Sequence, residues 1–203
     1  MIVYVETNFL LELALQQEQH ASCEALVQLA ESKAITLSMP AFSVLEATQN
    51  LRRMSVERGK FQEDVNKQGR DVNRTHGFGK EAAFAAVADA LVRHVQQAEL
   101  SLAQLKARLF QVVRFLPLDG AVAAELSRYI EDYELEPPDA TVLASVMNDP
   151  QLGQERSCFL NRNTEDFDQP SIVDLLRQRN CKLIGHFDHG LRYVQSVLKG
   201  PKP

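Results

Sequence analysis

The chain has 203 residues, 45% of them hydrophobic, which suffices to bury one sizeable core and is too short for two full domains. Its formal charge of −5, from 22 basic and 27 acidic residues, excludes the overall basic excess that marks many nucleic-acid binders. Cys23, Cys158 and Cys181 are odd in number and far apart, so they exclude a disulfide framework or a zinc knuckle and favour a reducing cytoplasm.

The amino-terminal segment does not have the pattern of an export signal. It lacks a basic region, carries Glu6 and Glu12 within its apolar stretch, and shows no small-residue cleavage site. No uninterrupted apolar run approaches the ~20 residues that a membrane span needs. We therefore expect a cytoplasmic protein with no membrane association.

Residues 2–5 form a β-branched apolar run that predicts a buried strand, and a helical pattern follows at once, with apolar spacing over 9–13 and 23–30. Glu6 lies between strand and helix. In open α/β sheets, ligands bind beyond the carboxyl ends of the strands, so this carboxylate is a candidate site residue. The simpler interpretation is that Glu6 or Thr7 caps the helix.

A second strand is predicted over 35–39, ended by Pro40, and a helix from 41 to 53 continues into a basic stretch. Glu46 lies early on this helix, beside the same crevice if the two strands are parallel. Residues 51–80 carry eight basic and four acidic side chains, a net charge of +4 against −9 for the remainder. Such a run is typical of a solvated helical face.

A helical elaboration is expected over about residues 55–115, within a single domain spanning 1–203. Residues 55–78 are polar and contain Gly59, Gly69 and Gly77, with Gly79 directly after them, so no boundary is predicted there. Over 84–112, apolar residues recur at three- and four-residue steps and predict a long helix, ended by residues 116–118. Its near-heptad seam packs either against a helix of the same chain or against a second copy in a homodimer.

Strand and helix signals alternate through the remainder of the chain. A helix over 121–133 precedes Pro137 and Pro138, which suit a first helical turn; Asp139 follows either as a helix starter or as a carboxylate facing a crevice. A strand over 158–160, a polar turn over 161–167, a helix over 171–179, a strand over 181–185 and a helix over 191–198 complete the pattern. His186 and His189 are interpreted as a surface turn. The alternation predicts an α/β fold with a parallel sheet flanked by helices.

Four segments, taken in order, resemble the PIN-domain nucleases across about four fifths of the chain. They are Glu6-Thr7-Asn8-Phe9-Leu10 after a strand, Ser43-Val44-Leu45-Glu46 on a helix, Pro138-Asp139-Ala140-Thr141, and Asn161-Arg162-Asn163-Thr164-Glu165-Asp166-Phe167. Each motif is short, and their agreement in order carries the resemblance. It implies a three-layer α/β/α fold and an acidic pocket that binds Mg²⁺ or Mn²⁺ and cuts single-stranded RNA.

The resemblance also assigns roles to residues. The catalytic carboxylates would be Glu6, Glu46, Asp139 and Asp166; the metal ligands would be Glu6, Asp139, Asn163 and Asp166; Thr7, Asn8 and Ser43 would support them. Arg52, Arg53 and Arg58 would hold the RNA backbone. A VapC-like toxin role, with an antitoxin protein as partner, follows from the same resemblance.

Two departures from the family pattern keep a second hypothesis open. Glu6 is one methylene longer than the usual Asp, and Asn163 places an amide where a carboxylate is common. These changes favour a catalytically inactive PIN-like scaffold that binds RNA or protein.

A third hypothesis is a metal-dependent hydrolase of small phosphoesters. No G-x-S-x-G, G-x-G-x-x-G or Walker loop is present.

Overall fold

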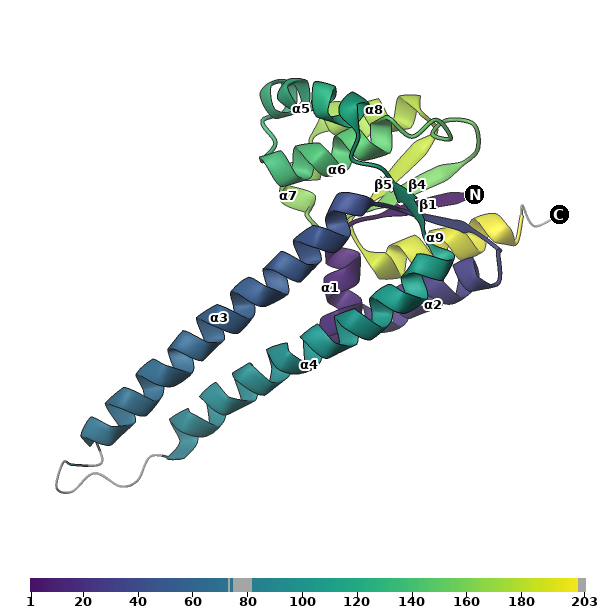
Figure 1. Cartoon of the computed structure of the whole chain (residues 1–203). Coiled ribbons are helices and arrows are strands. Elements are labelled where there is room, and N and C mark those ends of the chain that lie inside the picture. The colour runs from purple at the N-terminus through teal and green to yellow at the C-terminus, as the bar shows by residue number, and fades with distance from the viewer. Residues whose placement is uncertain (73, 75–81, 201–203) are drawn as a thin grey trace.

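The strand predicted over residues 2–5 is the middle strand of a five-stranded, all-parallel sheet with helices on both faces (Figure 1). The computed structural model describes residues 1–72, 74 and 82–200. The sheet has the order β3-β2-β1-β4-β5 and consists of β1 (Ile2–Val5), β2 (Thr36–Pro40), β3 (Arg114–Leu116), β4 (Ser157–Leu160) and β5 (Cys181–Ile184). The predicted three-layer α/β/α class is confirmed.

Two hydrophobic cores separate the helical layers. Val3 and Val5 of β1 point into one core, whereas Ile2 and Tyr4 point into the other, as the two-residue period of a strand requires. The first core is covered by α1 (Thr7–Leu15), α2 (His20–Glu31), the bases of α3 (Ala41–Val72) and α4 (Ala82–Val112), and α9 (Phe187–Leu198). The second is covered by α5 (Gly120–Tyr133), α6 (Pro137–Met147), α7 (Thr164–Phe167) and α8 (Pro170–Gln178).

The strand order reverses next to β1. From β1 the chain moves outward through β2 to β3, then crosses to the other side of β1 to form β4 and β5. Ligand crevices in open α/β sheets form at such a switch point, because the helices that follow its two strands leave on opposite faces. The carboxyl ends of β1 and β4 therefore define the expected site.

Helices α3 and α4 lie side by side and extend well beyond the sheet (Figure 1). We call their distal parts, residues 54–72 and 82–97, the helical arm. Arg58 bridges the arm, because its Nη1 lies 3.0 Å from both the Leu91 carbonyl oxygen and His94 Nδ1. The predicted helical elaboration is thus present. Helix α3 is continuous from Ala41 to Val72, so it ends within the stretch 55–78 for which the sequence predicted no boundary. Gly77 and Gly79 lie outside the described residues.

The apolar seam of α4 packs mainly within the chain. Ala98, Leu102 and Leu109 are buried at its base, where α4 contacts α1 and α3. On the arm, by contrast, Phe84 on the same helix is 63% exposed. Homodimer formation through this seam stays a prediction.

Three local expectations need correction. Residues 114–116 form β3, an edge strand that the sequence did not predict, because three residues directly after a long helix show no alternation. Helix α9 begins at Phe187, so the expected surface turn at His186 and His189 is instead the first turn of that helix. The expected polar turn over 161–167 contains the short helix α7.

A buried polar network holds β3 in place. Arg114 donates to the Asp149 carboxylate, with Nη1 2.9 Å from Oδ1, and its Nε donates to Ser38 Oγ at 3.1 Å. The Tyr4 hydroxyl donates to the same carboxylate at 2.6 Å. Because each buried polar group has a charged or hydrogen-bonding partner, the network fixes the edge strand without leaving an unpaired charge.

Within the part of the chain that the structure describes, no helix is long and apolar enough to span a bilayer.

Substituting Gly190 tests the packing of α9 on the strand that leads to the site. A Cβ there would lie 2.6 Å and 2.7 Å from the two methyl carbons of Leu160, a fully buried residue at the end of β4. We expect Gly190→Ala to lower the free energy of unfolding by about 1–3 kcal/mol through overpacking. Urea unfolding measures this change.

The matched control is Gly59→Ala on α3, where an added Cβ meets no atom within 4 Å. Alanine is the better helix former, so this variant should be unchanged or more stable by about 0.5–1 kcal/mol. Equal losses in both variants would contradict the proposed close packing.

Candidate functional site

The four predicted acidic positions lie together at the carboxyl edge of the sheet. Glu6 follows β1, Glu46 lies in the second turn of α3 after β2, and Asp166 lies in α7 after β4. Asp139 enters from the first turn of α6, on the opposite face of the sheet. Segments separated by up to 160 positions therefore supply one cluster, as the parallel strand order requires.

Glu6 is both a helix cap and a site residue. Its Oε2 accepts a hydrogen bond from the Asn8 backbone N–H at 2.8 Å, which caps α1 as the simpler interpretation proposed. The side chain is only 5% exposed, and Oε1 is buried with no hydrogen-bond partner among the described residues. A buried carboxylate oxygen without a partner is costly, and it indicates a position available to a ligand.

Two small hydroxyl side chains lie beside the acidic cluster. Thr7 donates a short hydrogen bond to Glu46 Oε2, which fixes this carboxylate against the start of α1. Ser43, one turn before Glu46 on α3, is fully buried, and its Oγ also has no hydrogen-bond partner among the described residues. The crevice thus contains a second polar atom that a ligand or water can satisfy.

Asn163 connects the two remaining acidic residues. Its Nδ2 donates to Asp166 Oδ2 at 2.6 Å and lies 3.4 Å from Asp139 Oδ1, while its backbone N–H is held by Asn161 Oδ1 at 2.7 Å. With this amide orientation the side-chain nitrogen faces both carboxylates. A 180° rotation of the amide would present its oxygen to a cation instead.

Mutual repulsion among the carboxylates shows how close they lie. The pKa of Glu6 is raised to about 8, first by burial and then by the nearby Glu46 and Asp139 carboxylates, against the opposing hydrogen bond from Asn8. The pKa of Asp139 is raised to about 6, first by burial and then by Asp166. The cluster therefore holds protons near neutral pH, or else requires a cation to neutralise it.

The donor set fits a hard divalent cation. Carboxylate and amide oxygens are the ligands that Mg²⁺ and Mn²⁺ prefer, and no atom in the described part of the chain makes a hydrogen bond with the buried Glu6 Oε1. Among the residues that the structure describes, no three His, Cys, Asp or Glu side chains already converge on one metal position. Ion binding would therefore require side-chain rotation, for which Glu46 and Asn163 would exchange their present hydrogen bonds.

The predicted RNA-binding arginines differ in their surroundings. Arg52 and Arg53 are exposed on α3, about two turns beyond Glu46, where they are accessible to a phosphate backbone. Arg58 is instead committed to α4 through the Leu91 carbonyl and His94. The structure therefore places Arg58 in the packing of the helical arm.

A buried ion pair that the sequence reading missed anchors the loop carrying Asn163. Arg162 Nη1 donates to Glu12 Oε2 at 2.7 Å, and the Glu12 side chain on α1 is almost completely buried. The other Glu12 oxygen accepts from the Gln19 backbone N–H, and Gln19 Oε1 accepts from the Phe187 backbone N–H at 2.7 Å. The sequence signal that could have indicated this pair is Glu12, an acidic residue on an otherwise apolar helix.

Comparisons of the chain with protein-family models, with curated proteins and with solved structures each found no match. Function is therefore inferred from the residues of the crevice.

The raised pKa of Glu6 predicts how stability changes with pH. Its folded pKa of about 8 lies above its ordinary value, so the unfolded chain binds fewer protons between these two values. The contribution of Glu6 to stability should therefore be fully present below about pH 4.5 and be lost as the pH rises through 8, with a decrease on the order of 3–4 kcal/mol between pH 5 and pH 8. Urea unfolding in EDTA at both pH values measures this loss.

Glu6→Gln cannot ionise, so its stability should depend much less on pH, while the exposed Glu131→Gln on α5 should behave like the unsubstituted protein. Parallel pH profiles for all three proteins would refute a titrating Glu6.

The anchoring role of Arg162 is testable through its two acidic partners. Arg162→Ala leaves the buried Glu12 charge unpaired and should cost about 3 kcal/mol in the free energy of unfolding. Glu18→Gln removes only the exposed partner of Arg162 and should cost less than about 1 kcal/mol. If thermal or urea unfolding showed similar small losses for both variants, the Glu12 pair would not anchor this loop.

Proposed function

We propose that the chain is a Mg²⁺- or Mn²⁺-dependent ribonuclease that hydrolyses phosphodiester bonds in single-stranded RNA, as its resemblance to the PIN-domain nucleases implies. One observation supports this proposal most directly. Four carboxylates from four separate segments meet at the switch point of a parallel sheet, and one of them keeps a buried oxygen that has no hydrogen-bond partner among the described residues. Structural ion pairs bring opposite charges together, whereas this cluster brings like charges together.

Glu6 and Asp139 would hold the ion, with Asn163 and Asp166 completing its surroundings directly or through water. The ion, when bound, supplies Lewis-acid activation of water and neutralises charge that develops on the phosphoryl group. Glu46, fixed by Thr7, is placed to orient the attacking water or a second ion. Burial and the neighbouring Asp166 raise the pKa of Asp139 to about 6, and a bound cation would favour the ionised form of this carboxyl.

The substrate would approach along α3. Arg52 and Arg53 are exposed on this helix beyond Glu46, so they can pair with phosphates on one side of the cleaved bond. The preference for RNA over DNA comes from the family resemblance. The toxin role and an antitoxin partner are further predictions from the same source.

The inactive scaffold is the second candidate. It is favoured by the amide of Asn163, which neutralises one position of the cluster and donates hydrogen bonds to Asp166 and Asp139 in the present arrangement. A scaffold would keep the fold and bind RNA or protein without Mn²⁺ binding in the crevice. Isothermal titration with Mn²⁺ separates the two candidates.

The deciding experiment is cleavage of labelled single-stranded RNA by purified protein with Mg²⁺, Mn²⁺ or EDTA. We expect metal-dependent cutting that Asp139→Asn reduces about 100-fold, as removal of an electrostatic stabiliser does elsewhere. Glu131→Gln, with the same loss of charge on exposed α5, should retain activity.

Equal cutting by the unsubstituted and Asp139→Asn proteins would indicate a contaminating nuclease. If RNA stayed intact under all conditions and Mn²⁺ did not bind, the scaffold would replace the nuclease. Turnover of chromogenic phosphoesters without RNA cleavage would instead indicate a small-phosphoester hydrolase.

A further inference from the structure

The outer strand β5 has backbone groups that face away from the sheet. Ser157 N–H donates to the Asn180 carbonyl and Asn161 N–H to the Ile184 carbonyl, both at 3.2 Å, so even-numbered residues of this segment face β4. In a parallel pair, consecutive residues present their N–H and C=O groups to opposite sides. The backbone groups of Cys181 and Leu183 therefore point outward, where none of the described strands pairs with them. Cys181 is only 2% exposed and Leu183 is half-buried, so Leu183 has the more accessible backbone groups.

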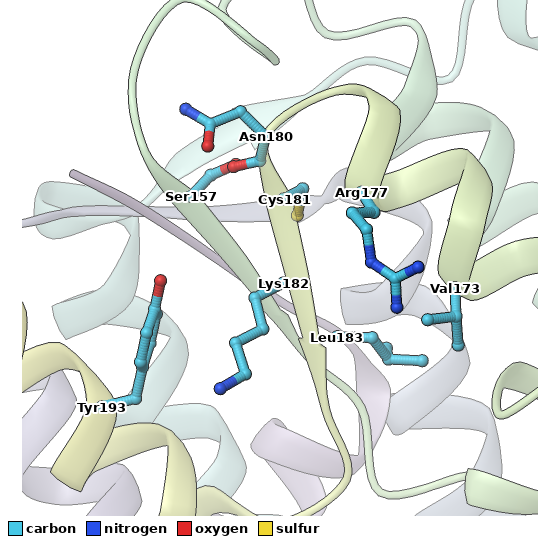
Figure 2. Close-up of a pocket in the computed structure, with 8 residues that line it drawn as sticks. All are labelled: Ser157, Val173, Arg177, Asn180, Cys181, Lys182, Leu183 and Tyr193. Carbon is cyan, nitrogen blue, oxygen red and sulfur yellow. The ribbon is translucent and has the colours of Figure 1, made fainter.

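A groove of about 370 Å³ follows this free edge. Figure 2 shows Val173 and Arg177 of α8 on one side of β5 and Tyr193 of α9 on the other, with Lys182 and Leu183 on the strand between them. Because the two helices cover opposite faces of the sheet, the groove has a backbone floor between two side-chain walls. These are the dimensions and chemistry that suit one added extended strand.

The walls of the groove are cationic, although the chain as a whole has a net charge of −5. Lys182 Nζ lies 4.8 Å from the centre of the Tyr193 ring, and Arg177 is largely exposed. Arg177 pairs with Asp174 on the same helix, but an exposed pair of this kind contributes little and leaves the guanidinium accessible. One cation thus lies toward each face of the strand that would be added.

We propose that this groove binds an extended, acidic peptide segment of another protein, which pairs with β5 as a sixth strand. Main-chain hydrogen bonds would be made by Leu183, the outward-facing residue of β5 that is not fully buried. Side chains of the peptide would alternate between the Arg177 wall and the Lys182 wall, so acidic residues on either side meet a cation. Twofold pairing of two β5 edges would instead bring the Lys182 and Arg177 side chains of two copies together, which disfavours a second copy.

The test uses a synthetic eight-residue peptide in which pairs of glutamates alternate with pairs of valines, so that glutamates lie on both faces of the added strand, and follows backbone amide signals of the full chain by NMR. We expect saturable shifts at Cys181 and Leu183, with about ten-fold weaker binding of a peptide that has lysine in place of glutamate. N-methylation of alternate peptide residues should abolish binding, because it removes strand hydrogen bonds.

Charge reversal supplies the matched variants. Arg177→Glu and Lys182→Glu alter exposed side chains, so the fold should persist, and each should weaken binding of the glutamate peptide about ten-fold. Arg93→Glu makes the same charge change on α4, outside the groove, and should leave binding intact. Equal binding of glutamate and lysine peptides, binding that survives N-methylation, or a dimer that Lys182→Glu dissociates would overturn the proposal. None of these outcomes depends on the proposed nuclease activity.

Discussion

The placement of β1 between β2 and β4 is the constraint on which the candidate site depends. A central parallel strand is buried on both faces, so its residues are apolar up to Val5, and the first polar side chain after it emerges at the carboxyl edge. That side chain is Glu6. Because the strand order reverses here, α3 and the β4–α7 loop approach it from the two neighbouring strands, and α6 approaches from the opposite face.

This placement has an energetic cost that packing elsewhere must offset. Burial, and to a smaller extent repulsion from the neighbouring carboxylates of the cluster, raises the pKa values of Glu6 and Asp139. The surrounding structure is correspondingly well fixed: Thr7 holds Glu46, and the buried Arg162–Glu12 pair holds the loop of Asn163. Destabilised charge within a rigid frame is the pattern of a binding or catalytic centre.

Two features outside the crevice, the helical arm and the edge of β5, enlarge the surface on which the chain could contact other molecules. The helical arm carries α3 away from the acidic cluster, with Arg52 and Arg53 on its near part. At the far edge of the sheet, β5 offers unpaired backbone groups beside Arg177 and Lys182. The crevice and the edge groove lie on different sides of β4, so occupation of one does not sterically require occupation of the other.

Sequence alone determined the alternation of elements, because two- and three-to-four-residue periodicities report directly which face of a segment is buried. It also located the acidic residues, since Glu6 and Asp139 stand at element boundaries. Only the tertiary structure decided the strand order that brings them together, the short strand β3 fixed by Arg114 and Asp149, and the commitment of Arg58 to the arm. These features depend on contacts between segments that are distant in the chain. Such contacts produce no periodic pattern in the local sequence, so the sequence alone does not predict them.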